Sequence, residues 1–543
     1  MKVVDAVAQI LKAEGVEFLF AYPVNHLIEA AAKVDIRTVI VRQERTGLHM
    51  ADAISRLSSG KKIGVFGMQH GPGTENAFGG VAQAYGESSP IVVLPMGYPR
   101  RERQVDPNFD PTINYRHVTK SIETLTLPDS VVPAMRRAFN AVRTGRPQPA
   151  MVVVPTDLMQ EEVPEPLNYT PMRAIRSGPD PDDVRVAVDM LLAAEHPVIY
   201  AGQGIHYAQA WDELISLAEH LQIPVTTTLT GKSAFPENHP LALGCANRSQ
   251  PKMVMTHLRA ADLIFGIGCS FTFTPFGIRM PDGKKILHST LDAKDVNKDV
   301  ESDFALVGDA KLTLQAILDE LEARNVDHRL ETSNVDEAIA AERQEWLGEW
   351  MPKLTSNEVP LNPYRVIWDL MYAVDRENVI VTHDAGGPRD QVAPFWQPTQ
   401  PLSYIGWGKT TQLGYGLGLA MGAKLAHPEK LCINIWGDAA IGFTGMDFET
   451  AARERIPILS ILLNNSSMAC EIGIMQVSTE KYGSTDISGN YAAMAEAFGG
   501  YGERVTEPDQ IIPAIQRGIE QTRAGKPALL EFITAKETAT SVY

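Results

Sequence analysis

The sequence has no hydrophobic run long enough to cross a membrane. A transmembrane helix needs about 18 or more consecutive apolar residues, and no stretch of the 543 residues approaches that length. The N-terminal segment MKVVDAVAQILKAEGVEFLF has helical periodicity and lacks the apolar block of a signal peptide. We therefore expect a cytoplasmic protein that has no membrane partner.

Cysteine is scarce, and positive charge is outnumbered. The four cysteines, Cys245, Cys269, Cys432 and Cys470, are far apart and match no zinc-binding or redox spacing. Lysine and arginine total 49 against 66 aspartate and glutamate residues, which gives a formal net charge of −17. Non-specific binding to nucleic acid requires a basic surface, so we expect no nucleic-acid partner. An anionic substrate is not excluded, because local fields decide its binding.

The length and the element pattern predict three α/β domains. At roughly 150 residues per domain, a chain of 543 residues corresponds to about three domains. Apolar strands alternate with helical stretches, which is the pattern of parallel sheets. We therefore predict parallel-sheet domains at residues 1–162, 181–324 and 363–543, with linkers at about 163–183 and 325–362.

Two polar strand ends in the third domain form a candidate site for a metal-bound diphosphate. The apolar strand 431–436 ends at Gly437-Asp438, and the strand 458–463 ends at Asn464-Asn465. Ligands bind at the carboxyl ends of strands in such units, and carboxylate and amide oxygens are hard ligands that suit Mg²⁺. Small residues let backbone N–H groups approach phosphates at a helix start, and here they are Gly437, Ala439 and Ala440. The alternative is an ordinary buried strand–helix–strand unit with a polar end.

This GD…NN pattern resembles the signature of thiamine diphosphate (ThDP) enzymes. The usual form is GDG, and this sequence has Ala439 at the third position, which acetolactate synthases also tolerate. The resemblance implies that the Asp438 carboxylate, the Asn465 side chain and the Ser467 backbone carbonyl bind Mg²⁺. It covers nearly the whole chain, in the order pyrimidine-binding, central and diphosphate-binding domain.

Glu44 follows the apolar strand 37–41 within the segment RQERTGLHMADA. ThDP enzymes similar to acetolactate synthase carry a glutamate at this position. The resemblance implies that Glu44 is catalytic and binds the cofactor: it hydrogen-bonds the pyrimidine N1′ and favours the tautomer that removes the proton from thiazolium C2. That role needs a carboxyl group in a largely apolar pocket, where its pKa rises. The alternative is a solvated carboxylate at a strand end.

A glycine-rich turn lies in the block from Ile63 to Gly97, where we expect strands at 63–66 and 91–95 and a helix at 76–85. In the resembling family this turn, here Gly71-Pro72-Gly73, approaches the pyrimidine and thiazolium rings. The residues before it point towards the reacting carbon. The resemblance therefore implies catalytic roles for Gln69 and His70 and cofactor contacts for Gly73 and Asn76. His70 is alternatively only a turn residue.

The segment WGKTTQLGYGLGLAMGAKLAHPEK, residues 407–430, resembles the family's loop and helix that hold the cofactor in a bent conformation. The resemblance implies that Leu413 lies between the two cofactor rings and that the Thr411 carbonyl accepts a hydrogen bond from the 4′-amino group. Leu413 is alternatively a core leucine on an amphipathic helix. Upstream, Gly386 and Gly387 follow the predicted strand 378–382 and are implied to contact the diphosphate.

The middle domain carries a glycine turn without a complete dinucleotide motif. Gly202-Gln203-Gly204 follows the predicted strand 197–201, but there is no GxGxxG and no acid at the expected strand end. The stretch 225–244 resembles acetolactate synthases and 2-hydroxyacyl-CoA lyases, whereas ADLIFGIGCSFTFTPFG lacks the arginine of the synthase loop that contacts FAD. FAD is therefore doubtful, and ADP or CoA in this domain stays open. Lys232 is interpreted as a phosphate contact or, preferably, as a surface lysine.

The resemblance implies an enzyme that breaks or makes a carbon–carbon bond next to a carbonyl. One interpretation is a decarboxylating carboligase like acetolactate synthase, acting on a 2-oxo acid. The other is a lyase similar to 2-hydroxyacyl-CoA lyase or oxalyl-CoA decarboxylase, with an aldehyde or acyl-CoA as a reactant. The segment SSMACEIGIMQVSTEKYG lacks the tryptophan that acetolactate synthases carry after the metal loop, which weakens a biosynthetic synthase assignment. The intact Glu44, Asp438 and Asn465 argue against a catalytically inactive paralogue.

The family arrangement also implies a homodimer or a homotetramer. In it, the first domain of one chain faces the third domain of its partner, so Glu44 and Asp438 would meet across a subunit interface. A two-fold pairing of chains would cover the strand ends of the first and third domains at the same time.

Overall fold

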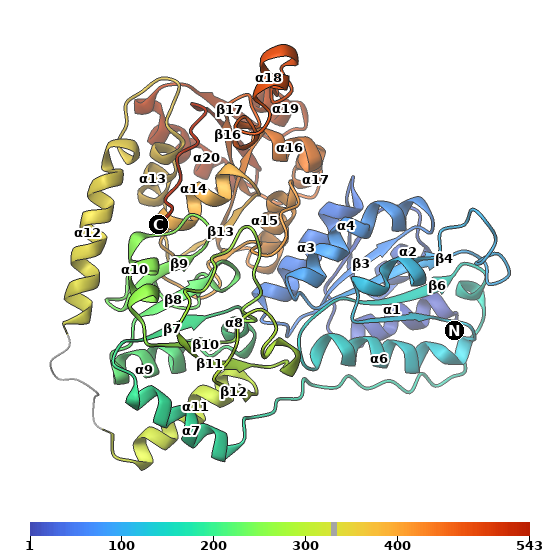
Figure 1. The fold of residues 1–543 in the computed structure, drawn as a ribbon. Helices are drawn as coiled ribbons and strands as arrows, with labels where there is room; N and C mark the ends of the chain where they lie inside the picture. Colours follow the sequence, from blue (N-terminus) through green and yellow to red (C-terminus); the bar gives the residue numbers. More distant parts are fainter. Residues whose placement is uncertain (327–333) are drawn as a thin grey trace.

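The computed structural model describes residues 1–326 and 334–543. It contains three six-stranded sheets in which every strand pairing is parallel. This confirms the expected fold class, and each sheet lies inside one of the predicted domain ranges (Figure 1). No described helix is long and apolar enough to cross a membrane. The predicted linker 325–362 falls partly outside the described residues.

The first sheet has the strand order β2-β1-β3-β4-β6-β5. Alternate residues of β3 face two cores, so that Val65 packs with α1, α2 and α6 while Phe66 packs with α3 and α4. The strands are β1 Phe18–Ala21, β2 Arg37–Ile40, β3 Gly64–Met68, β4 Ile91–Gly97, β5 Ser121–Thr124 and β6 Ala150–Pro155. The main helices are α1 Val3–Ala13, α2 His26–Lys33, α3 Glu44–Leu57, α4 Pro72–Gly86 and α6 Val131–Arg143.

The second sheet has the order β12-β11-β10-β7-β8-β9. Read from its other edge, this is the 3-2-1-4-5-6 order of a doubly wound sheet, whose ligand site lies where the order reverses, here between β7 and β10. The strands are β7 Pro197–Ala201, β8 Val225–Thr228, β9 Ala242–Ala246, β10 Leu263–Ile267, β11 Lys285–Thr290 and β12 Phe304–Val307. The main helices are α7 Pro181–Ala193, α9 Trp211–Leu221, α10 Lys252–Ala260 and α11 Ala310–Ala323.

The third sheet has the order β14-β13-β15-β16-β18-β17, which repeats the order of the first sheet and agrees with a duplicated-domain plan. The strands are β13 Val379–His383, β14 Tyr404–Ile405, β15 Leu431–Gly437, β16 Leu459–Asn464, β17 Tyr501–Val505 and β18 Ala528–Ile533. The helices are α12 Val335–Leu354, α13 Pro363–Ala373, α14 Gly387–Phe395, α15 Tyr415–Ala426, α16 Asp438–Thr444, α17 Phe448–Arg453, α18 Gln476–Tyr482, α19 Tyr491–Ala497 and α20 Ile511–Arg523.

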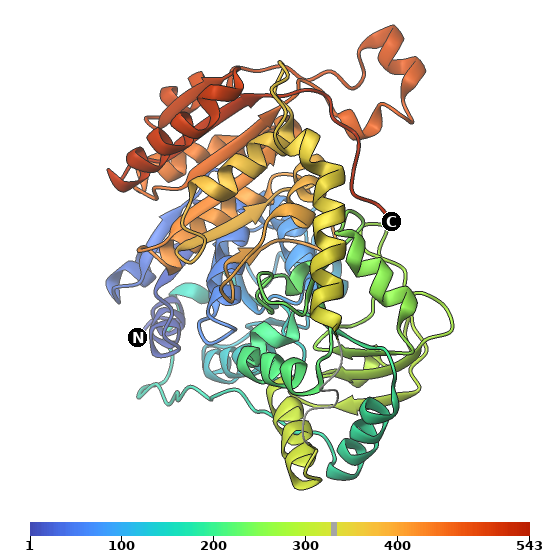
Figure 2. The same ribbon diagram turned by 90° about the vertical axis from the view of Figure 1, so that its left-hand side faces the viewer.

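The first and third domains meet through α3 and α15, which lie side by side (Figures 1 and 2). Two glycines allow this approach. A Cβ at Gly418 would lie 2.6 Å from the Cβ of His49, and one at Gly422 would lie 2.5 Å from the Met50 carbonyl oxygen. The first domain is tied to the rest of the chain by residues 163–180, which form no helix or strand (Figure 1).

Helix α4 begins earlier than the sequence pattern predicts. The expected start was residue 76, whereas the structure has Pro72 as the first helical residue and Gly71 as the N-cap with a φ of 62°. Proline is favoured at this position because its missing N–H would be unpaired there anyway. The predicted glycine-rich turn is therefore partly the first turn of the helix, which places Gly73 and Asn76 on α4.

Candidate functional site

Glu44, the predicted catalytic residue, is the first residue of α3 and is only 6% exposed. Burial raises the pKa of its carboxyl group, against the opposing effects of its own backbone and of a hydrogen bond to the Asn76 side chain. A Cβ added at Gly73 would lie 3.6 Å from Glu44 Oε1. The structure thus brings Glu44, Gly73 and Asn76 together, with a carboxyl group whose environment suits proton transfer.

Asp447 of the third domain fixes the N-terminal turn of α3. Its Oδ1 accepts a hydrogen bond from the Arg42 N–H at 2.7 Å, and its Oδ2 accepts one from the Thr46 hydroxyl at 2.7 Å. Asp447 is fully buried, and its charge adds to the rise in the pKa of Glu44. No local pattern marks Asp447, because both of these partners are remote in the sequence, and the sequence analysis missed it.

Gln69 and His70 follow β3, and both are half-buried. The His70 ring meets the Tyr98 ring edge to face, with centroids 4.5 Å apart. Within the described residues, His70 Nδ1 is buried with no hydrogen-bond partner, and burial lowers the pKa of the ring, so the neutral form dominates near neutrality. A Cβ at Gly73 would lie 3.1 Å from Gln69 Cβ, so Gln69 and Glu44 both lie close to Gly73.

Asp438, Asn465 and Ser467 converge at the ends of β15 and β16. The Ser467 N–H donates to Asp438 Oδ2 at 3.2 Å and to Asn465 Oδ1 at 2.9 Å. Burial raises the pKa of Asp438, while the surrounding backbone N–H groups oppose this rise. The three predicted metal ligands therefore meet around one amide group. The small residues named with them lie at the start of α16 and are Gly437, Ala439 and Ala440.

The environment of Asp438 fits a bound cation. Its carboxylate is 4% exposed, and it forms no ion pair with a side chain of the described residues. A buried carboxylate without a countercharge is costly. In residues 1–326 and 334–543, no three His, Cys, Asp or Glu side chains are grouped to hold a metal ion. A cation at Asp438 would therefore use amide, carbonyl and ligand oxygens, as Mg²⁺ does when it is bound with phosphate.

The loop between Gly406 and Gly414 carries Thr411 and Leu413, which are both half-buried. Leu413 packs against the core that the first and third domains share. Beside it, Gln412 Oε1 is buried with no partner in the described part of the chain, so it can still accept a hydrogen bond. The loop thus offers an apolar side chain and a free acceptor to a ligand between the domains.

Asp384 anchors the end of this loop. Its carboxylate accepts hydrogen bonds from the N–H groups of Gly414 and Gly416, at 2.8 and 2.9 Å. Burial raises the pKa of Asp384 to about 6. The next residues, Gly386 and Gly387, are half-buried, and Gly386 has a φ of 77° with open space where a Cβ would stand. The backbone of these two glycines can therefore contact a diphosphate, whereas the Asp384 carboxylate already binds the loop.

Three models of one protein family match the chain in the order of its three sheets. The N-terminal TPP binding domain of thiamine pyrophosphate enzymes matches residues 1–124, the central domain matches residues 184–317 and the C-terminal TPP binding domain matches residues 384–532. Thiamine pyrophosphate (TPP) is another name for ThDP. The chain belongs to the thiamine pyrophosphate enzyme family.

Relatives with known names place it in the acetolactate synthase-like branch. A probable acetolactate synthase large subunit of Methanocaldococcus jannaschii is 29% identical over 98% of this chain and 92% of its own length. Acetolactate synthase isozyme 3 large subunit of Escherichia coli is 27% identical over 96% of this chain and 92% of its own length. Glyoxylate carboligase of Escherichia coli O157:H7 is 27% identical over 100% of this chain and 94% of its own length. The chain is therefore a ThDP-dependent enzyme of this branch.

The described molecule is one chain, and its Glu44-bearing domain lies against its own third domain. The expected arrangement, in which the first domain faces the third domain of a partner, stays a prediction. The segment 163–180 connects the first domain to the rest without helix or strand. Extended chain spans up to about 3.5 Å per residue, so identical contacts could be made by exchange of first domains between two chains.

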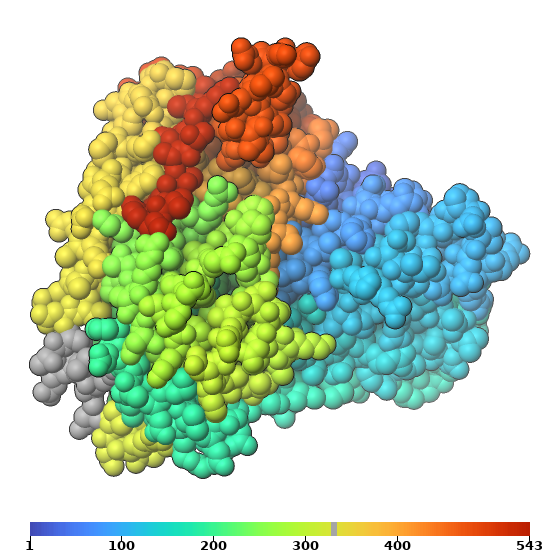
Figure 3. Space-filling view, in the orientation of Figure 1, coloured from blue at the N-terminus to red at the C-terminus, as the bar shows by residue number. Residues whose placement is uncertain are grey.

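A cavity of about 570 Å³ lies beside the middle domain, at the point where its strand order reverses. Gly204 and Gly268, which follow β7 and β10, line it, with Tyr200 and Phe271 stacked 5.5 Å apart. Its lining also draws on the other two domains, which pack against the middle domain (Figure 3). Asp309 is the one acid among the lining residues. Of the basic ones, Arg143, Arg146 and Arg176 form ion pairs with carboxylates, whereas Lys61, Arg173 and Lys409 form none in the described chain.

The interpretation of Lys232 as a surface lysine or phosphate contact is wrong. Its side chain is fully buried and forms an ion pair with Glu237. Lys409 instead supplies an ammonium group at the cavity: it forms no ion pair in the described chain, and burial lowers its pKa to about 8.

Proposed function

We propose that this protein is a ThDP- and Mg²⁺-dependent carboligase that acts on a 2-oxo acid. The observation that carries the proposal is the contact between the Glu44-bearing turn of the first domain and the third domain. Glu44 is buried at the start of α3, and Asp447 ties that turn to the third domain, whose Asp438 and Asn465 lie together at the ends of β15 and β16. The relatives named as acetolactate synthase support the substrate class.

In this proposal Asp438, Asn465 and the Ser467 carbonyl hold Mg²⁺, and Gly386, Gly387 and the small residues at the start of α16 receive the diphosphate. When bound, ThDP would supply a nucleophilic carbon for attack on a carbonyl and a place to hold the resulting electron pair. Glu44 exchanges a proton with the pyrimidine N1′, for which a raised pKa is suitable. Leu413 would contact the rings of bound ThDP, and the Thr411 carbonyl would accept a hydrogen bond from its amino group. Gly73 and Asn76 complete the pyrimidine side.

Gln69 and His70 are proposed to face the substrate. The neutral His70 ring, with an unpartnered buried nitrogen, can donate or accept a proton at the reacting carbonyl oxygen. The His70 ring packs edge to face against Tyr98, which restricts its position.

The test is turnover of pyruvate as the representative 2-oxo acid. Protein dialysed against EDTA should release no CO₂, and ThDP with Mg²⁺ together should restore CO₂ release and the formation of a longer 2-hydroxy product. Full activity without ThDP would refute the cofactor assignment, whereas ThDP binding without any 2-oxo acid turnover would refute only the substrate class.

The basic cavity favours a second candidate, a lyase or decarboxylase that acts on an acyl-CoA. Cationic side chains bind phosphates, and the stacked Tyr200 and Phe271 offer a flat apolar contact. We propose that the cavity binds ADP or the nucleotide part of CoA. Calorimetry with ADP and with CoA tests this binding proposal. Only turnover of an acyl-CoA, and not binding alone, would favour the lyase over the carboligase.

We also propose a homodimer or homotetramer. Ile474, Val477 and Tyr482, near the Asn465 loop, are 85%, 64% and 82% exposed, and large apolar groups at such exposure mark a surface that another chain covers. Val477 and Tyr482 lie on α18 and Ile474 lies just before it, and this helix projects from the third domain (Figures 1 and 3). Light scattering at micromolar concentration tests this proposal, and a monomer there would contradict it.

A further inference from the structure

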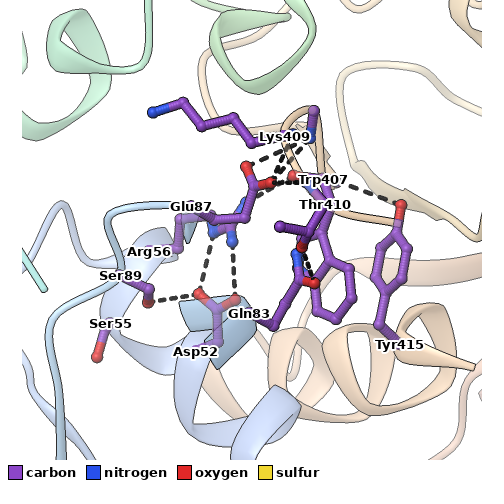
Figure 4. Close-up of polar contacts among 12 residues, drawn as sticks. Asp52, Ser55, Arg56, Gln83, Glu87, Ser89, Trp407, Lys409, Thr410 and Tyr415 are labelled. Atoms are coloured by element: carbon purple, nitrogen blue, oxygen red, sulfur yellow. Dashed lines mark hydrogen bonds and ion pairs between the residues drawn. The ribbon is translucent and has the colours of Figure 1, made fainter. Parts of the chain in front are cut away.

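A buried carboxylate of the first domain binds the loop between Gly406 and Gly414 of the third domain (Figure 4). Glu87, the residue that ends α4, is fully buried. Its Oε1 accepts a hydrogen bond from the Lys409 N–H at 2.7 Å and lies 3.2 Å from the N–H groups of both Gly408 and Thr410. Three successive backbone donors therefore converge on one carboxylate, which is the geometry of an anion-binding nest.

Neighbouring side chains of the first domain complete this contact. Arg56 donates to the Gly406 carbonyl at 2.7 Å and forms a two-pronged ion pair with Asp52, at 3.0 and 2.7 Å. The Thr410 hydroxyl donates to Gln83. Arg56 and Lys409 oppose the burial that raises the pKa of Glu87, so they favour its charged form. The first domain thus contacts four positions of the loop, residues 406, 408, 409 and 410, through charged or amide side chains.

The two ends of the loop are fixed by different domains. Glu87 holds residues 408–410, and Asp384 of the third domain holds Gly414 and Gly416. Between these anchors lie Thr411, Gln412 and Leu413, which form no helix or strand of their own. A segment without its own backbone ladder depends on such side chains for its conformation.

We propose that Glu87 is a positioning residue for ThDP: by gathering the N–H groups of residues 408–410 it fixes Thr411 and Leu413 in the conformation that receives the cofactor. The role is indirect, through the loop, and Arg56 supports it by compensating the buried charge. ThDP affinity therefore depends on the docking of the first domain. The inference rests on the ThDP site and not on the substrate class.

The test compares Glu87→Ala and the near-isosteric Glu87→Gln with Asp369→Asn. Asp369 is a buried carboxylate of α13 that is paired with Arg365 at 2.8 Å, remote from the loop in sequence, and so controls for the loss of a buried ion pair. Calorimetry with ThDP and Mg²⁺, without substrate, should show at least tenfold weaker binding for both Glu87 variants. Glu87→Asp, which keeps the charge, should recover part of the affinity, and Asp369→Asn should bind like wild type.

A second readout needs no cofactor. Lys409 is a potential trypsin site whose backbone Glu87 holds, so the Glu87 variants should be cleaved after Lys409 at least tenfold faster, as fragment masses would show. If Glu87→Ala does not fold, Gln83→Met tests the same contact through Thr410, with a smaller expected change of about threefold in each measurement. Folded Glu87 variants with ThDP affinity within twofold of wild type and unchanged cleavage would overturn the proposal. Because no substrate is used, failure of the carboligase assignment would leave these results unaffected.

Discussion

The hydroxyl of Thr46, two residues after Glu44, donates a hydrogen bond to the buried Asp447 carboxylate at 2.7 Å. This bond joins the first turn of α3 to the third domain, so it should stabilise both the domain contact and the position of Glu44. Removal of the hydroxyl in Thr46→Val leaves Asp447 short of a donor at a buried site, which costs about 1–3 kcal/mol. We expect a lower unfolding midpoint and weaker ThDP binding. Thr46→Ser keeps the hydroxyl and should resemble wild type; equal behaviour of the two variants would contradict this account.

The close contact between α3 and α15 predicts a strong effect of a single methyl group. A Cβ at Gly422 would lie 2.5 Å from the Met50 carbonyl oxygen, so Gly422→Ala must push the helices apart. Overpacking of this kind costs about 1–3 kcal/mol. Gly348, in α12, has open space around its Cβ position, so Gly348→Ala is a matched control that should be neutral or stabilising. Urea denaturation compares them, and equal stability of the two variants would argue against this helix contact.

Binding of an anionic ligand in the basic cavity should depend on pH through Lys409. Burial lowers the pKa of this lysine to about 8, so its ammonium form dominates at pH 7 and is largely lost at pH 9. ADP or CoA should therefore bind more tightly at pH 7 than at pH 9, as calorimetry would measure. Lys409→Met should lose most of this difference, and Lys409→Arg, which stays charged at pH 9, should keep the tighter binding. An unchanged pH dependence in Lys409→Met would exclude this group as the cause.

Mixing of inactive chains tests whether first domains are exchanged between subunits. Glu44→Ala and Asp438→Ala each remove one half of the site. If every chain closes its own site, a mixture of the two variants regains no activity. We expect exchange, as the family arrangement implies, and therefore partial recovery after mild dissociation and reassociation. Without recovery, in heterodimers confirmed by mass, each chain would build its site alone.

The sequence predicts well where the strands that carry the candidate site end, but it does not reveal the contacts between distant segments. Asp438 and Asn465 are candidates because strand ends can be read from apolar runs, and these runs match β15 and β16 to within one residue; their roles as ligands stay a prediction. Glu87 and Asp447 lie in segments with no distinguishing pattern, and their roles depend on partners more than 300 positions away. Lys232 was misread because nothing in its surroundings shows that Glu237 neutralises it in a buried pair. The start of α4 was placed too late, although Pro72 carried the signal.

The most direct test of the central claim is the rate of hydrogen–deuterium exchange at C2 of bound ThDP, in wild type and in Glu44→Gln. The amide cannot exchange a proton with N1′, while its size leaves the buried site at the start of α3 intact. The account predicts exchange at least ~100-fold slower in the variant, the lower scale of acid–base assistance, with ThDP still bound. An unchanged exchange rate in cofactor-saturated Glu44→Gln would contradict the assignment of Glu44 and the site built around it.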